Sequence, residues 1–258
     1  MGEAKRKQYN RKQFLREHPW CCYCGAPATT TDHCPPRAFF KDREWPEGYE
    51  FPCCEPCNSE GRLYEKVVAV VMKPRLLDAD IDERWGRSVK SIKINEPALW
   101  AEWMSLDRRE IRNSFRARFG EMGDEMRRHG YGMIAIGPLT GALLQSFAVK
   151  LGQALFFKHN GRRLDGKMWC RRFDPLSRET DFAELLSLTP VVATLKRGQA
   201  DLSSQFSYAY NYSPDDGAFH AVITMGEQYG LTVTAVDFPL AERLAPFPVD
   251  PEYVTPQR

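Results

Sequence analysis

The chain has 258 residues, of which 43% are hydrophobic and 12% aromatic, and its formal net charge is +2 at neutral pH. This composition allows a packed core, in one large domain or in a small module joined to a larger one. The sequence argues against two classes, membrane-spanning proteins and secreted proteins. No apolar stretch approaches the roughly 18 residues of a membrane span, and no apolar signal segment follows the N-terminus. We therefore expect a cytoplasmic protein that has no membrane partner.

Residues 1–19 are predicted to form a basic arm. Between Met1 and Glu17 the chain has six lysines and arginines against two glutamates. Such a run can neutralise the phosphates of a nucleic acid, or it can be a solvated chain terminus. Composition alone leaves both interpretations open.

Seven of the eight cysteines fall in the next segment, residues 20–73. In a reducing compartment, clustered cysteines indicate a metal site rather than disulfides. Cys21 and Cys24 form one CxxC pair, and Cys54 and Cys57 form a second. Two such pairs have the spacing of a tetrahedral four-thiolate zinc site. We predict a closed, structural zinc that stabilises this small segment.

The neighbouring cysteines leave alternatives to this ligand set. Cys22 and Cys53 lie directly beside the proposed ligands, and Cys53-x3-Cys57 is a second usable spacing. Cys34 could also be a ligand, although its position beside Asp32 and His33 favours a packing role.

Between the two cysteine pairs lies the stretch TTTDHCPPRAFF, residues 29–40, and Asn58 directly follows the second pair. The order CxxC, Asp-His-x-Pro-Pro, CxxC-Asn resembles the HNH endonuclease family, in particular its zinc-stapled members, over about residues 20 to 70. The resemblance implies a ββα-metal fold, with strands at 29–32 and 49–52 and a helix from near Asn58.

The resemblance also assigns roles to individual residues. His33 matches the general base, and Asp32 and Asn58 match the ligands of a catalytic Mg²⁺ or Mn²⁺. The chemistry suits these residue types, because a neutral imidazole can accept the proton of a water molecule near neutral pH. Carboxylate and amide oxygens are ligands that Mg²⁺ prefers. Taken alone, a histidine at a strand end is usually structural.

Two positions depart from the pattern of that family. Many members have an asparagine about four residues before the second CxxC, where this chain has Glu50. Glu50 could accept a hydrogen bond from His33, or it could be an exposed residue. Family members also often have a lysine three residues after the final asparagine, and here that position is Gly61.

Two charged residues lie on the same predicted helix face as Asn58. Arg62 could clamp a substrate phosphate, or it could be solvated. Glu65 could be an outer metal ligand, or it could hold Arg62 in place.

Helical patterns occupy the middle of the chain. Residues 61–73 are predicted as a helix that ends before Pro74, residues 75–103 as irregular, and residues 97–128 as one long charged helix. An apolar stripe on this helix is expected to pack in the core, and it consists of Ile111, Phe115, Phe119, Met122 and Met126.

The C-terminal part reads first as a strand at 131–137 and a buried helix at 141–158. A basic stretch, 159–172, could track a nucleic-acid backbone or be a solvated loop. Three β-rich runs then predict an antiparallel meander, and a proline-rich tail is expected to be irregular. The three runs and the tail cover residues 203–213, 218–226, 230–238 and 246–258.

We therefore predict an α+β protein: a zinc-stapled ββα-metal module followed by a larger helical and antiparallel-sheet domain. The expected division is a basic arm (1–19), the module (20–73), a helical connection (74–130) and a C-terminal α+β domain (131–258).

The resemblance implies a metal-dependent endonuclease acting on nucleic acid, with DNA favoured, of a family often found in phages and anti-phage defence. The alternative is a catalytically silent, zinc-stapled module that binds nucleic acid or protein. The C-terminal domain could bind a partner or a second copy of the chain.

Overall fold

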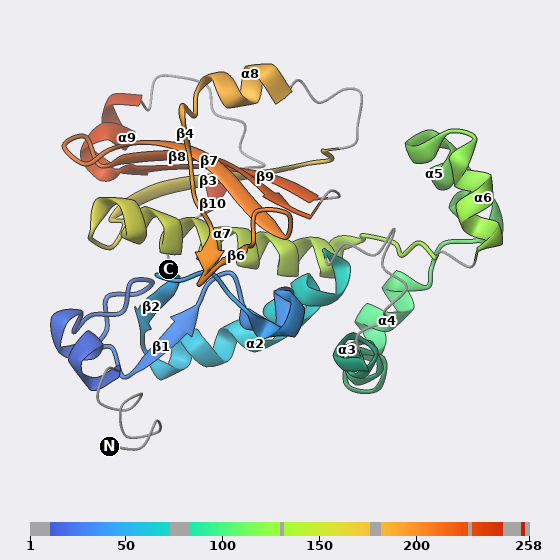
Figure 1. Cartoon of the computed structure of the whole chain (residues 1–258), viewed down its shortest axis with the longest axis horizontal. Coiled ribbons are helices and arrows are strands. Elements are labelled where there is room, and N and C mark those ends of the chain that lie inside the picture. Colours follow the sequence, from blue (N-terminus) through green and yellow to red (C-terminus); the bar gives the residue numbers. More distant parts are fainter. Residues whose placement is uncertain are drawn as a thin grey trace.

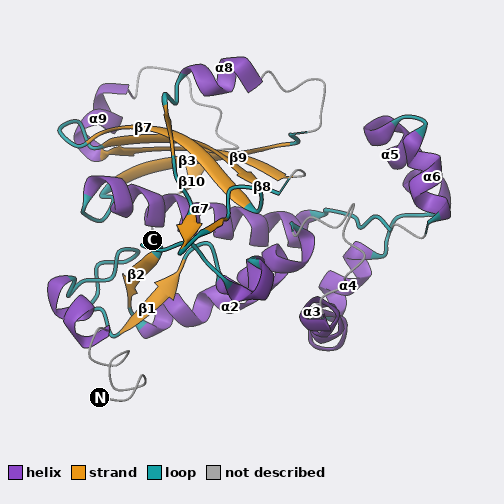
Figure 2. Cartoon of the chain, viewed as in Figure 1, coloured by secondary structure: helices purple, strands orange, loops and turns teal. Residues whose placement is uncertain are grey.

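The computed structural model describes residues 11–72, 83–129, 132–175, 182–226, 229–244 and 254–255. Within these ranges the chain is α+β with antiparallel sheets, as predicted (Figure 2). The long helix α7 (Pro138–Asn160) lies between a small ββα unit and a six-stranded sheet (Figure 1). It is the structural centre of the molecule.

The small unit contains β1 (Thr30–His33), β2 (Glu50–Cys53) and α2 (Glu55–Val71). The two strands pair antiparallel with His33 opposite Glu50, and each lies one residue later than predicted. The loop between them carries two short 3-10 helices, η1 (Arg37–Phe39) and η2 (Lys41–Arg43). The expected helix start near Asn58 is wrong by one turn. The helix begins earlier because a proline in its first turn costs no hydrogen bond there.

The middle of the chain differs from the prediction. The segment expected to be irregular contains α3 (Glu83–Asn95), and the single helix expected over 97–128 is three helices. These are α4 (Pro97–Trp103), α5 (Arg108–Phe119) and α6 (Met122–Arg128). A capping box at Asp107 begins α5, and Gly120 with φ 59° ends it.

These breaks disperse the apolar stripe that was expected to pack in the core. Phe115 is buried, but Met122 is 62% exposed. Ile111, Phe119 and Met126 are half-buried. The apolar sequence pattern continues through Gly120, but helix α5 ends there and α6 starts as a separate helix. The prediction of one core-packed stripe is therefore wrong for the α6 part.

The larger sheet has the strand order β10-β3-β9-β8-β7-β4. The predicted meander is confirmed, because β7, β8 and β9 pair antiparallel in sequence. The six strands are β3 (Gly166–Phe173), β4 (Val191–Val192), β7 (Phe206–Ser213), β8 (Ala218–Met225), β9 (Tyr229–Asp237) and β10 (Val254–Thr255). The smaller elements are β5 (Lys196–Arg197), β6 (Ala200–Asp201), α8 (Phe182–Ser187) and α9 (Phe238–Leu244).

Two other predictions for this region need correction. Residues 132–137 form no strand, and Tyr131 lies outside the described residues. The basic stretch 159–172 is not one loop, because it runs from the end of α7 into β3. Most of the predicted basic arm and of the proline-rich tail also lies outside the described residues; residues 11–17 are helical.

One continuous apolar core extends from Cys21 in the small unit to Ala235 in the sheet. Helix α7 contributes to it on both sides, and Lys150 is the one charged residue among its buried positions. Among the described helices, none combines the length and the apolar character needed to cross a membrane.

Candidate metal centre and the His33 site

Four cysteine sulfurs meet where the small unit begins. The Sγ atoms of Cys21, Cys24, Cys54 and Cys57 all lie within 4.8 Å of one another. The first two come from a tight turn that Gly25 closes with φ 78°, a left-handed conformation that favours glycine. The other two come from the N-cap and first turn of α2. The cluster can therefore hold a metal ion such as zinc.

The other cysteines of this segment lie outside the four-sulfur cluster. Cys22, Cys34 and Cys53 are all buried. The neighbouring Cys53 side chain lowers the pKa of Cys21 to about 4, which favours the thiolate form that metal binding requires. The Cys53 thiol itself donates a hydrogen bond to the Cys54 carbonyl oxygen at 3.2 Å. Burial raises the pKa of the Cys22 and Cys34 thiols, which keeps them protonated. The geometry thus favours Cys54 over Cys53 as the ligand.

His33 and Glu50 face each other across β1 and β2. The Nε2 atom of His33 lies 3.2 Å from Oε1 of Glu50. This hydrogen bond is the main reason that the pKa of Glu50 is lower than usual. Of the two interpretations of Glu50, the structure has the one in which its carboxylate contacts the imidazole.

Arg37 and Trp45 complete the surroundings of His33. A guanidinium nitrogen of Arg37 also contacts Nε2, which cannot donate to Glu50 and accept from Arg37 at the same time, so each pairing requires a different tautomer. The Trp45 ring lies edge-on to the imidazole at 4.8 Å, and the guanidinium groups of Arg37 and Arg197 lie 3.7 and 3.9 Å from its centroid. Sequence reasoning missed Arg37 and Trp45 because the loop between β1 and β2 has no regular spacing, and it missed Arg197 because that residue comes from β5, far away in the sequence.

Asp32 is buried, and its carboxylate contacts three hydrogen-bond or ion-pair donors. Its Oδ2 accepts a hydrogen bond from the Tyr23 hydroxyl at 2.7 Å and lies 2.8 Å from Nζ of Lys150. Its Oδ1 accepts a hydrogen bond from the backbone N–H of His33 at 2.9 Å. The same Lys150 ammonium lies 2.6 Å from Oε1 of Glu65, and its side chain is only 5% exposed. Lys150 therefore bridges two carboxylates.

Two features of the structure accommodate Lys150: the two carboxylates that keep it charged, and a glycine that leaves space for it. Burial alone would lower the pKa of Lys150, but the carboxylates of Asp32 and Glu65 raise it above its ordinary value, so the ammonium is charged. Gly61 makes room for it, because a Cβ at this position would lie 2.5 Å from both Nζ of Lys150 and Oε1 of Glu65. Gly61 on α2 is thus approached closely by an ammonium from α7.

The remaining predicted residues lie along α2. Arg62 is largely exposed, with a guanidinium nitrogen 3.8 Å from the Glu55 carboxylate. The interpretation that Glu65 holds Arg62 is therefore wrong, because Glu65 pairs with Lys150. Asn58 is half-buried in the first turns, and its side chain forms no hydrogen bond with other described residues.

The oxygen groups of the site are of the type that Mg²⁺ or Mn²⁺ prefers. Asp32, Asn58 and Glu65 supply two carboxylates and an amide. Within the described residues Oδ1 of Asp32 accepts one hydrogen bond, and the side chain is only 5% exposed. Among the described residues, the four cysteines are the one group of three or more His, Cys, Asp or Glu side chains whose ligand atoms converge, and Lys150 places a positive charge between the Asp32 and Glu65 carboxylates.

We compared the chain with protein-family models, with curated proteins and with solved structures, and no match was found in any of the three comparisons.

Proposed function

We propose that the protein is a metal-dependent endonuclease of the HNH type, which hydrolyses phosphodiester bonds in nucleic acid, with DNA as the favoured substrate. One observation carries the proposal. A histidine at the end of β1 is hydrogen-bonded to a carboxylate on β2, in a ββα unit whose helix begins at four clustered cysteines. Zinc bound to those cysteines would stabilise the unit without taking part in the reaction.

His33 has the environment that a general base needs. When Nε2 carries the proton and donates it to Glu50, the lone pair of the imidazole lies on Nδ1. Among the described residues, none hydrogen-bonds to Nδ1, so a water molecule can do so. The Arg37 guanidinium, which lies 3.7 Å from the centroid of the neighbouring Trp45 ring, brings positive charge to this end of the strands and favours the approach of a phosphate.

Asp32 and Asn58 would hold the catalytic ion, with Glu65 as a further oxygen donor. Such an ion supplies positive charge to the scissile phosphate and to the leaving oxygen. Lys150 holds the carboxylates of Asp32 and Glu65 in fixed positions. Arg62, exposed on α2, can approach a phosphate of the bound strand.

A plasmid-nicking assay tests this proposal. Purified protein with confirmed zinc content is incubated with supercoiled DNA and Mg²⁺ or Mn²⁺. We expect His33→Ala to lower the nicking rate by about 10²- to 10⁴-fold, the usual contribution of a general base. Glu50→Gln should lower the nicking rate by a smaller factor than His33→Ala does. Glu44→Gln, at an exposed position of the loop that joins β1 to β2, should nick like the wild type. Nicking at equal rates by the wild type and His33→Ala would refute the proposal.

The Lys150 ion pairs favour a second candidate function. An ammonium between Asp32 and Glu65 neutralises part of the negative charge that would attract a divalent ion. The protein would then be a zinc-stapled module that binds nucleic acid without cleaving it. Binding of labelled DNA that is unaffected by Mg²⁺ or Mn²⁺, together with no nicking, is the result expected of this alternative.

A further inference from the structure

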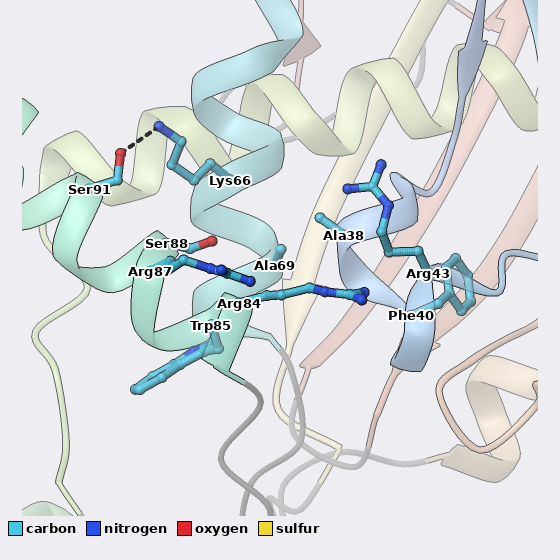
Figure 3. Close-up of a pocket in the computed structure, with 10 residues that line it drawn as sticks. All are labelled: Ala38, Phe40, Arg43, Lys66, Ala69, Arg84, Trp85, Arg87, Ser88 and Ser91. Atoms are coloured by element: carbon cyan, nitrogen blue, oxygen red, sulfur yellow. Dashed lines mark hydrogen bonds between the residues drawn. The ribbon is translucent and has the colours of Figure 1, made fainter.

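A basic pocket of about 470 Å³ lies where the small unit meets α3, between α2, α3 and the loop that joins β1 to β2 (Figure 3). Four cationic side chains line it: Arg43, Lys66, Arg84 and Arg87. The hydroxyls of Ser88 and Ser91 also line it, and none of the lining residues within the described part of the chain is acidic. We call this cavity the basic pocket.

The four cations come from three separate elements. Arg43 lies in η2, Lys66 in α2, and Arg84 and Arg87 in α3. Lys66 donates a hydrogen bond to Oγ of Ser91 at 3.1 Å, which ties α2 to α3 at the pocket. Figure 3 shows Arg84 extending from α3 toward Arg43. The convergence is therefore produced by tertiary packing and not by one charged helix face.

Gathering these positive charges costs electrostatic free energy, which a bound anion would offset. Like charges gathered at one cavity repel each other. In the described part of the chain, Arg43, Lys66 and Arg87 form no ion pair with a carboxylate. Arg43 also has φ 61°, beside Asp42 with φ 52°, and such left-handed conformations are uncommon for residues other than glycine. Backbone strain of this kind concentrates at functional sites.

The charges and hydroxyls suit a phosphate group. Guanidinium groups bind phosphate oxygens through paired hydrogen bonds, and lysine adds a compact charge. Lys66 follows Asn58 by eight positions on α2, which corresponds to about 12 Å along the helix axis at roughly 1.5 Å per residue. A nucleic-acid strand at the His33 site would place a neighbouring phosphate within that distance, a few nucleotides away.

We infer that the basic pocket binds a phosphate of the nucleic-acid strand on which the His33 site acts. The inference rests on the proposed function for the identity of its ligand. It assigns the pocket a role in holding the strand beside the scissile bond, and this role requires no chemistry from the pocket residues.

The test compares full-length variants in binding a short, fluorescein-labelled single-stranded DNA, measured by anisotropy at increasing NaCl without divalent ions. The double variant Lys66→Gln/Arg87→Gln should bind about tenfold more weakly. The slope of log K against log salt concentration should become less negative by about 0.7 for each phosphate that the variant no longer neutralises. Lys90→Gln is the matched control, because it removes an exposed charge from the same helix without touching the pocket.

Three results decide the inference. Weaker DNA binding together with a flatter salt dependence, seen in the double variant but not in Lys90→Gln, supports the inference. Equal binding by the two variants overturns it. Binding of pyrophosphate is measured for the same proteins. If the wild type binds pyrophosphate and the double variant does not, while the double variant still binds DNA, the inference is also overturned, since the pocket would then hold a small free ligand. These readouts do not depend on cleavage, so failure of the nuclease proposal is recognised separately by the plasmid-nicking assay.

Discussion

The ammonium of Lys150 lies 2.8 Å from the carboxylate of Asp32, which joins the middle of α7 to the residue that precedes the candidate base. The same ammonium lies 2.6 Å from Glu65 on α2. Three elements thus meet at one buried charge. The position of Asp32, and with it the end of β1, depends on a helix that belongs to a different part of the sequence.

Replacing Lys150 with methionine should destabilise the fold strongly. The substitution leaves the buried Asp32 and Glu65 carboxylates unpaired, and the loss of one partner from a buried ion pair costs about 3–5 kcal/mol. Urea unfolding followed by circular dichroism measures the change. Adding Glu65→Gln to Lys150→Met should recover part of the loss. The control is Lys90→Met on the surface of α3. A loss for Lys150→Met no greater than that of the control would show that the pairs do not form.

Alanine substitution at two helical glycines should have opposite effects. Alanine usually favours a helix over glycine by about 1 kcal/mol. At Gly86 in α3 a Cβ meets no atom within 4 Å, so Gly86→Ala should raise the free energy of unfolding. At Gly61 the added Cβ lies 2.5 Å from Lys150 Nζ and Glu65 Oε1, so Gly61→Ala should lower it by opening the ion pair. A similar gain at both positions would contradict the described approach of Lys150 to α2.

Zinc content should separate the cysteines of the cluster from their neighbours. Cys24 is exposed, so Cys24→Ser removes a ligand with little change in packing and should abolish stoichiometric zinc binding. Cys22→Ala removes a buried thiol outside the cluster; it should retain zinc and lose only the stability that the packing of this thiol provides. Elemental analysis of the folded variants measures both. Retention of zinc by Cys24→Ser with its loss in Cys22→Ala would overturn the ligand set.

The stability of the protein should fall on mild acidification because of His159. This imidazole lies 3.0 Å from the Tyr208 hydroxyl and stacks on Phe219, and burial lowers its pKa to about 4. In an unfolded chain the pKa of histidine is about 6.5. Between these two values the unfolded state binds the proton and the folded state does not, so the free energy of unfolding decreases as pH falls through this window.

His159→Phe should remove this component and flatten the pH dependence of urea unfolding between about pH 6.5 and 4. Phenylalanine keeps a ring stacked against Phe219 but has no titrating group. The control is His129→Phe, a surface position. A pH dependence that is the same in His159→Phe and the wild type would show that other groups are responsible.

Local patterns predicted those parts of the fold that are determined locally. The residues of each CxxC pair, and those of each β-rich run of the meander, lie close together in sequence. The segmentation of residues 83–128 was not predicted, because highly charged helices give little periodic signal at their ends. The capping box at Asp107 was the one available signal for the start of α5.

The candidate site was only partly predictable for a related reason. The sequence motif includes Asp32 and His33 but gives no sign of Lys150, whose partner Glu65 is 85 positions away. A signal for Lys150 did exist, because a lysine in an otherwise apolar buried helix is rarely left without a carboxylate partner. The identity of that partner depends on how α2 packs against α7, which local sequence does not specify.

The bridging role of Lys150 limits how the small unit can be transplanted. A fragment that ends at residue 72 would retain both cysteine pairs and Asp32, His33 and Asn58, yet it would leave two carboxylates without their counter-charge. It would also expose the face of α2 that packs on α7. For protein engineering, the smallest graft that preserves this site therefore extends through the end of α7 at Asn160.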